Sequence, residues 1–185
     1  MKAVFLDRDG TIVVERGYIT VPGMIELIPG VAEAIVRLRE GGWKVFVATN
    51  QGCVGKGMIT EEELGEINFR MLSMLGAEGA ELDGIYVCPH HPDATLADYA
   101  MECDCRKPRP GLLERAASEN GLDLSQCVMI GDTMRDLDAA RSAGARAILV
   151  LTGHGSETAS LKHGAEHVAA NLPAAVRWLL DGSSR

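Results

Sequence analysis

The stretch Asp7-Arg8-Asp9-Gly10-Thr11 decides the fold prediction for this chain of 185 residues. It follows the apolar run Ala3-Val4-Phe5-Leu6, which is typical of a buried strand in a parallel sheet. In open α/β sheets, ligands bind just beyond the carboxyl ends of the strands, so Asp7 and Asp9 lie where chemistry is expected. Because residues two apart in an extended segment point the same way, both carboxylates can face one cavity. Taken alone, the five residues fit equally well a strand that ends in an Asp-Gly turn.

Two adjacent carboxylates have a specific chemical consequence. They repel each other, and the repulsion raises the pKa of one of them unless a cation neutralises it. A Mg²⁺ ion would relieve this repulsion. Asp7 would then be ionised and able to act as a nucleophile, and Asp9 would be able to shuttle a proton.

Apolar runs alternate with helical patterns along the rest of the chain. This alternation predicts an α/β fold with a doubly wound parallel sheet. Further strands are predicted at residues 45–48, 84–87, 127–130, 147–151 and 167–169. Helices are predicted between Gly30 and Gly41, and over residues 60–75, 110–121, 134–142 and 173–180, with a long irregular stretch at 88–109. With no internal repeat and no linker, residues 1–185 are expected to form a single domain.

Composition excludes several classes of function. The net charge of -8 and the lack of a long basic run argue against nucleic acid or an anionic membrane as a partner. No segment approaches the roughly 18 apolar residues of a membrane span, and Asp7 ends the first apolar run too early for a secretory signal. The five cysteines are an odd count, which favours a reducing compartment over a disulfide framework. We expect a cytoplasmic protein that works as a monomer.

Three further polar motifs stand at the ends of predicted strands or before a helix. Thr49-Asn50-Gln51-Gly52 follows the second strand and offers a hydroxyl, two amides and backbone N–H groups to a phosphate oxygen. Gly131-Asp132-Thr133-Met134-Arg135-Asp136 follows the fourth strand. In it, Asp132 is either a site carboxylate or the cap of the next helix, and Asp136 lies one helical turn further on, where it could ligate through water or orient a ligand. Arg106-Lys107 offers a bidentate cation beside an ammonium group, although such a pair in a loop is usually only solvated.

Taken together and in this order, the motifs resemble those of the haloacid dehalogenase superfamily. The resemblance implies a phosphomonoester hydrolase that forms an aspartyl-phosphate on Asp7, with Asp9 as general acid and base. It further implies that Thr49 and Lys107 hold the phosphoryl oxygens. Mg²⁺ would be bound by the carboxylate of Asp7, the backbone carbonyl of Asp9 and Asp132. Such a site agrees with the general rule that phosphoryl transfer depends on positioning and charge neutralisation.

The second strong pattern is Cys88-x-His90 followed, after twelve residues, by Cys103-x-Cys105. Three thiolates and one imidazole are a structural zinc set, and four protein ligands leave no open position for catalysis. Scattered small polar residues rarely form two such tight pairs around one loop. We therefore predict a Zn²⁺-binding loop over residues 88–105, with His91 as an alternative to His90.

The sequence around this loop narrows the resemblance. Cys-Pro-His-His-Pro followed by Cys-Asp-Cys-Arg-Lys-Pro is similar to the histidinol-phosphatase-like branch of the superfamily. This implies that Arg106 recognises the substrate and that Tyr18, Asn50 and Gln51 line the site. The implied substrate is a small phosphorylated sugar, D-glycero-D-manno-heptose 1,7-bisphosphate losing its 7-phosphate, with histidinol phosphate or another small sugar phosphate as the alternative. Two departures concern the substrate rather than the chemistry: Gly52 replaces a frequent serine, and Thr133 replaces a lysine that touches substrate in some members.

The spacing of the motifs limits the architecture around the site. The interval from Thr11 to Pro29 has no room for a large cap domain, and one helix, one strand and the zinc loop fill the interval from Gln51 to Arg106. An open site is therefore expected, with specificity set by residues 15–21 and by the zinc loop. Two non-enzymatic alternatives remain. One is a phosphoacceptor module, which carries its acceptor on an interior strand, and the other is a zinc-stabilised phosphate-binding protein, which would not need all of the catalytic residues.

Overall fold

The protein is built on one six-stranded parallel sheet. The computed structural model describes residues 1–182, and its strand order is β3-β2-β1-β4-β5-β6. Val4 of the central strand pairs with Val45 on one side and with Val128 on the other. The doubly wound α/β prediction is therefore confirmed, and the strands are β1 (Ala3–Leu6), β2 (Lys44–Asn50), β3 (Gly84–Cys88), β4 (Val128–Gly131), β5 (Arg146–Val150) and β6 (His167–Ala169).

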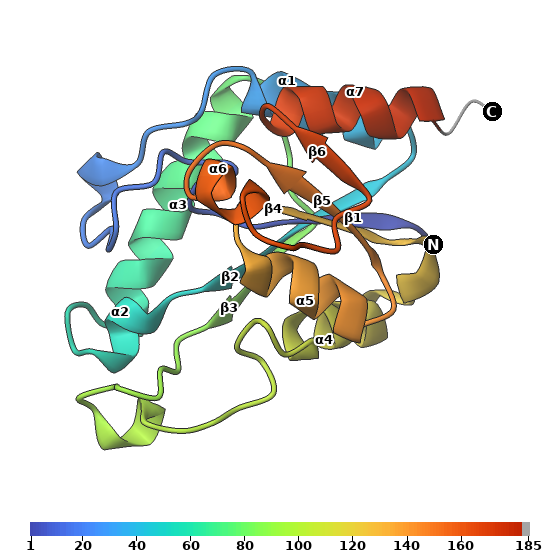
Figure 1. The fold of residues 1–185 in the computed structure, drawn as a ribbon. Coiled ribbons are helices and arrows are strands. Elements are labelled where there is room, and N and C mark those ends of the chain that lie inside the picture. The colour runs from blue at the N-terminus through green and yellow to red at the C-terminus, as the bar shows by residue number, and fades with distance from the viewer. Residues whose placement is uncertain (183–185) are drawn as a thin grey trace.

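Helices cover both faces of the sheet (Figure 1). Those that pack into the larger core cluster are α1 (Val31–Glu40), α3 (Glu61–Ala77) and α7 (Leu172–Gly182). The opposite face carries α4 (Gly111–Asn120) and α5 (Met134–Ser142). Two short helices lie among the loops, α2 (Gly52–Gly55) and α6 (Gly155–Ala159), together with 3-10 turns at Pro22–Met24, Ala97–Tyr99 and Leu124–Gln126.

Local sequence signals explain most helix ends. Thr60 and Glu63 form the predicted capping box at the start of α3, and Gly121 ends α4 in the left-handed region at φ 62°. At α5, however, Thr133 is the N-cap, with Asp136 as its capping partner. The alternative that Asp132 caps this helix is therefore wrong. The sequence did not predict α2 or α6, because each is about one turn long and begins with glycine, a weak helix former.

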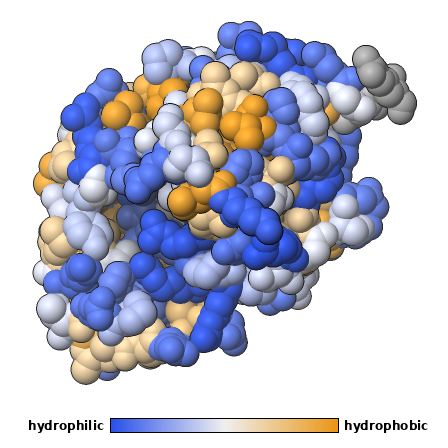
Figure 2. Space-filling model, viewed as in Figure 1, coloured by the Kyte–Doolittle hydropathy of each residue, from blue (hydrophilic) through white to orange (hydrophobic). Residues whose placement is uncertain are grey.

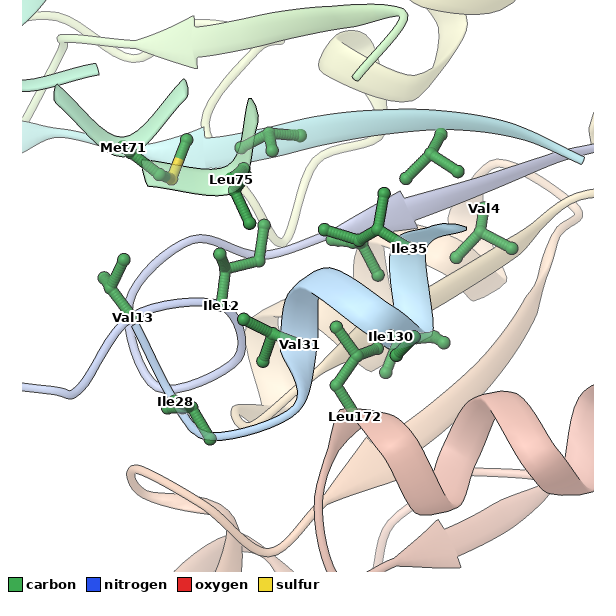
Figure 3. Packing of buried hydrophobic residues seen from close by; sticks show 14 of the residues in the cluster. Val4, Ile12, Val13, Ile28, Val31, Ile35, Met71, Leu75, Ile130 and Leu172 are labelled. Atoms are coloured by element: carbon green, nitrogen blue, oxygen red, sulfur yellow. The ribbon is translucent and has the colours of Figure 1, made fainter. Parts of the chain in front are cut away.

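The loop that follows β1 is anchored in the core. Figure 3 shows Ile12 and Val13 among the buried side chains that pack with Val31 of α1. The backbone reinforces this packing, since the N–H of Ile28 donates to the carbonyl of Ile12 over 2.9 Å. The aspartates just before this loop are therefore held on a rigid support.

The surface view in Figure 2 shows hydrophilic residues surrounding separate groups of hydrophobic ones. Among the exposed apolar side chains, Phe69 on the outer side of α3 is 70% exposed. Within residues 1–182, none of the helices combines the length and the apolar character that a membrane crossing requires.

Candidate active site

A cavity of about 290 Å³ opens at the carboxyl edge of the central strands. The strand order places β1 between β2 and β4, so the polar motifs that follow these three strands come together there. The loop before α4 adds two cations, Arg106 and Lys107. The cavity lining contains every residue predicted for catalysis, magnesium or substrate: Asp7, Asp9, Tyr18, Thr49, Asn50, Gln51, Arg106, Lys107, Asp132 and Asp136.

Lys107 is the buried cation at the floor of this cavity. Its Nζ lies 3.0 Å from Oδ1 of Asp7, 2.5 Å from Oδ1 of Asp136 and 2.7 Å from the carbonyl oxygen of Ala48. These three contacts engage all three hydrogens of the ammonium group. Burial alone would lower the pKa of Lys107, but the carboxylates of Asp136 and Asp7 outweigh it and raise the pKa. The group is therefore a fixed positive charge.

The carboxylates around Lys107 are short of positive charge. Burial, and then the charge of Asp136, raise the pKa of Asp7 to about 7 against the opposing effect of Lys107. Burial, and then the charge of Asp7, raise the pKa of Asp132 to about 8. One ammonium group thus faces more carboxylates than it can neutralise, so the charge of a further cation would be stabilised at this site.

Asp132 and Asp136 differ in how fully they are bound. Oδ2 of Asp136 accepts hydrogen bonds from the backbone N–H and the hydroxyl of Thr133, and its Oδ1 pairs with Lys107. Oδ2 of Asp132 accepts from the backbone N–H of His154, but its Oδ1 is buried without a partner. The chain also packs tightly here, because a Cβ on Gly10, at φ +77°, would lie 2.3 Å from Asp132 Oδ2. Of the two, only Asp132 has an oxygen left for a ligand.

Asp9 is held by side chains from two segments of the chain, the one that follows β1 and the one that follows β2. The guanidinium group of Arg8 donates to both of its oxygens over 3.1–3.2 Å. Nε2 of Gln51 donates to Oδ2 of Asp9 over 2.8 Å and to the hydroxyl of Thr49 over 2.9 Å. The side chain of Asp9 remains 17% exposed. Asp9 therefore presents an edge to the cavity although its carboxylate is firmly held.

Asn50 acts on the backbone of the neighbouring loop. Its Nδ2 donates to the carbonyl of Lys107 over 2.9 Å, and its Oδ1 accepts from the N–H of the same residue over 3.0 Å. The side-chain amide of Asn50 thus clamps the main chain that carries the buried ammonium group. Its position in the cavity lining agrees with the sequence, but its contacts in this structure are with the protein itself.

The rim of the cavity carries two residues that the sequence predicted and two that it did not. Tyr18, 42% exposed, and Arg106 lie there as predicted, with Arg106 Nη1 donating to the carbonyl of His90 over 2.8 Å. Arg135 and His154 line the same cavity without having been predicted. His154 follows β5, so the rule that strand ends carry sites could have found it.

His91 also belongs to the rim of the cavity rather than to the cysteine cluster. Its Nδ1 accepts from the N–H of Asp93 over 3.0 Å. Burial, and then the positive charge of Arg106, lower its pKa. The alternative in which His91 replaces His90 as a ligand finds no support in this geometry.

The four predicted zinc ligands form one cluster at the carboxyl end of β3. Sγ of Cys88 lies 3.1 Å from Sγ of Cys105 and 3.6 Å from Sγ of Cys103, and Nδ1 of His90 lies 3.4 Å from Sγ of Cys105. The cysteines are free of disulfides. Ligands about 2.3 Å from one tetrahedral zinc would lie roughly 3.8 Å apart, so the donor set and its spacing are compatible with zinc.

The chain is similar to known phosphatases over nearly its whole length. A family model described as HAD-hydrolase-like matches residues 104–175. The D-glycero-beta-D-manno-heptose-1,7-bisphosphate 7-phosphatase of Yersinia pestis is 40% identical over 180 residues, covering 97% of this chain and 89% of the relative. The D-glycero-D-manno-heptose-1,7-bisphosphate 7-phosphatase of Thermosynechococcus vestitus is 41% identical over 185 residues, covering 96% and 94% of the two chains.

A solved structure matches nearly the whole molecule. It is the D,D-heptose 1,7-bisphosphate phosphatase from B. bronchiseptica complexed with magnesium and phosphate, with a TM-score of 0.88, 35% identity, and coverage of 98% of this chain and 99% of the other. The superfamily expected from the order of the motifs is thereby confirmed. The chain belongs to the family of the D-glycero-D-manno-heptose-1,7-bisphosphate 7-phosphatases, within the haloacid dehalogenase superfamily.

Proposed function

We propose that this chain is a Mg²⁺-dependent phosphatase that removes the 7-phosphate of D-glycero-D-manno-heptose 1,7-bisphosphate through an aspartyl-phosphate on Asp7. Residues 1–185 would act as one domain, and one chain supplies all the cavity residues described. The observation that carries the proposal is the placement of a buried ammonium, Lys107 Nζ, 3.0 Å from Oδ1 of Asp7 at the floor of an open cavity. A phosphoryl group bound there would meet a nucleophile and a positive charge together.

The residues at the floor fit a magnesium ion. One oxygen each of Asp7, Asp132 and Asp136 lie within 4.8 Å of one another. Because Lys107 and Thr133 occupy the oxygens of Asp136, the free donors are Asp7 and the unpaired Oδ1 of Asp132. The backbone carbonyl of Asp9 would complete the protein ligands. Mg²⁺ held there would keep both carboxylates ionised and neutralise charge on the phosphoryl group.

In the first step, a carboxylate oxygen of Asp7 forms a bond to phosphorus while the bond from phosphorus to the sugar oxygen breaks. Asp9, in its protonated form, gives its proton to the departing oxygen. Oδ1 of Asp7 accepts from the backbone N–H of Arg8 over 2.7 Å and lies 3.0 Å from Nζ of Lys107. These two contacts orient the carboxylate. Once Asp7 is esterified it loses its charge, so the hydrogen of Lys107 that faced it is free to bind a phosphoryl oxygen. The hydroxyl of Thr49 would hold another.

In the second step, the Asp9 carboxylate takes a proton from water, and the water oxygen bonds to phosphorus. The bond from phosphorus to Asp7 breaks, which releases inorganic phosphate and restores the carboxylate of Asp7. Asp9 is again protonated, and the cycle is complete. In these two steps Asp136 does not touch the substrate. Instead, Asp136 holds the ammonium group of Lys107 in place.

The rim supports a substrate with a second anionic end. Arg106 and Arg135 both line the cavity, on the loop before α4 and at the start of α5. A guanidinium group binds phosphate in a bidentate manner, so either residue suits the distal phosphate of a sugar bisphosphate. Tyr18 offers an aromatic face to the sugar between the two ends.

We also propose that Cys88, His90, Cys103 and Cys105 hold one structural Zn²⁺ ion. Burial raises the pKa of the Cys88 thiol, so a cluster of thiolates at this place requires a cation. Arg106 and Lys107 follow the last ligand directly. The loop that the ion would hold therefore sets the positions of both cations.

Phosphate release from purified protein tests the function. With Mg²⁺, we expect turnover of the α or β anomer of heptose 1,7-bisphosphate to exceed turnover of histidinol phosphate. Asp7→Asn should abolish turnover, and Asp9→Asn should reduce it by roughly 10²–10⁴-fold. Asp181→Asn, an exposed carboxylate on α7, is the matched control and should retain full activity. Full activity in either site variant would contradict the mechanism, and a preference for histidinol phosphate would contradict the substrate.

A further inference from the structure

Arg8 is a buried charge for which the two steps above provide no side-chain role. It is the largest of the wholly buried side chains in the described part of the molecule, and its residue lies between the two catalytic aspartates. Unlike both neighbours, Arg8 is absent from the residues that line the cavity. Burying a guanidinium group is costly unless its hydrogen bonds are satisfied. Its partners therefore indicate what it does.

Those partners converge on Asp9. Besides the bonds to both oxygens of Asp9, Nη2 of Arg8 donates to Oε1 of Gln51 over 2.8 Å. Nη1 donates to Oδ1 of Asn68, on α3, over 3.1 Å. Since Asp9 faces the cavity and Arg8 does not, the guanidinium group holds the carboxylate from behind.

Gln51 closes the same network. Its two amide hydrogens go to Asp9 and Thr49, and its carbonyl oxygen accepts from Arg8. The side chain is almost fully buried, and its amide has no donor left for a substrate. Although the sequence resemblance places Gln51 among the substrate-binding residues, its contacts here tie Asp9 to the β2 loop.

We propose that Arg8 is a positioning residue that, with Gln51 and Asn68, holds the Asp9 carboxyl at the orientation from which it protonates the leaving oxygen. This inference rests on the proposed function, in which Asp9 is the general acid. The planar fork of arginine meets two carboxylate oxygens and an amide at once, which a lysine ammonium in the same place does not. Helix α3 thereby contributes to catalysis through Asn68, which lies outside the cavity lining.

The dependence of the hydrolysis rate on the leaving group shows whether Arg8 positions Asp9 or only supports the fold. Phenyl phosphate needs a proton on its departing oxygen, whereas 2,4-dinitrophenyl phosphate releases a stable anion without one. Because the dinitrophenyl ester is the larger of the two, each variant is compared with the wild type on the same ester. The ratio kcat/KM reports the steps up to departure of the phenol. A variant that only loosens the fold should lose kcat/KM for both esters alike. A variant that misplaces Asp9 should lose it for phenyl phosphate alone.

We expect Arg8→Lys to lower kcat/KM for phenyl phosphate by about 10²-fold, the usual effect of a misplacement near 1 Å. The loss for the dinitrophenyl ester should stay below about threefold, because no proton is donated to that ester. Asn68→Ala should show the same selectivity with about a tenfold loss. It carries the test if thermal melts show that Arg8→Lys does not fold. Glu66→Ala, an exposed residue on the same helix, is the control and should match the wild type.

Each outcome has one meaning. Selective loss of phenyl phosphate hydrolysis, parallel to that of Asp9→Asn, supports the positioning role of Arg8. Equal loss with both esters, or no loss in folded Arg8→Lys and Asn68→Ala, overturns it while leaving the phosphatase intact. If the wild type hydrolyses neither these esters nor heptose 1,7-bisphosphate with Mg²⁺ present, the proposed function fails first.

Discussion

Replacing Asp136 with asparagine tests whether the buried carboxylate is what holds Lys107 in place. Asp136 is wholly buried and meets Lys107 through Oδ1 and the N–H and hydroxyl of Thr133 through Oδ2. In Asp136→Asn, one side-chain atom becomes an amide nitrogen. Whichever way the amide turns, this donor faces either the ammonium group or the two donors of Thr133. The variant therefore removes a charge and also places donor against donor.

The expected loss of stability follows from these contacts. Breaking a buried ion pair typically costs roughly 3–5 kcal/mol, because it leaves a charge without its partner. Lys107 keeps Asp7 at 3.0 Å in the variant, so the lower end of that range, about 3 kcal/mol, is expected. For a chain of this size that loss lowers Tm by roughly 6–12 °C. Activity should fall by about 10²-fold, because Lys107 is no longer fixed beside the phosphoryl group.

Urea unfolding and phosphate release from an aryl phosphate measure the two effects. Asp138→Asn is the matched control on the same helix, since Asp138 pairs with Arg141 at the surface over 2.8 Å. Loss of such an exposed pair costs at most about 1 kcal/mol, and activity should be unchanged. If Asp136→Asn is as stable and as active as Asp138→Asn, the proposed role of Asp136 in fixing Lys107 is refuted.

Three further predictions test other parts of the structure. In steady-state kinetics, Arg106→Ala should raise KM for the sugar bisphosphate more than for an aryl phosphate, whereas Lys107→Ala should lower the hydrolysis of both substrates alike. If the two variants behaved identically, Arg106 would not be the residue that binds the distal phosphate. Cys103→Ser should lower the zinc content, measured by elemental analysis, below one ion per chain, and it should lower activity by about 10²-fold. The circular dichroism spectrum should stay that of the folded wild type. Full activity without zinc would exclude the structural role of the ion. Asp83 is partly desolvated, but Lys44, the N–H of Val45 and Arg39 outweigh this and lower its pKa below the ordinary 3.8. The stability that Asp83 contributes is therefore present above about pH 4 and disappears as the pH falls through the lowered pKa. Urea unfolding of Asp83→Asn should consequently show a deficit at pH 7 that vanishes in strong acid, and a constant deficit would contradict this reading.

The sequence by itself determined the strands, the five longer helices and the edge of the sheet at which the site lies. Apolar runs predicted all six strands, and local signals such as Thr60 with Glu63 located helix ends, because strand and helix patterns are written in neighbouring residues. The motifs follow strands, and parallel strands share one carboxyl edge, so Asp7, Thr49 and Asp132 were expected to meet. The cysteine spacing likewise predicted the cluster at β3.

What only the tertiary structure decided is which polar side chains line the cavity and which of them are bound to other parts of the chain. Asn50 binds the main chain of Lys107, 57 positions away, and Arg8 binds Asn68, 60 positions away. No local pattern encodes such pairs, because they exist only once the strand order β2-β1-β4 brings separate loops and α3 together. The rim residues Arg135 and His154 belong to the same class. Helical and strand propensities act over a few residues, whereas the hydrogen bonds of a buried polar group are completed by whatever the folded chain places beside it.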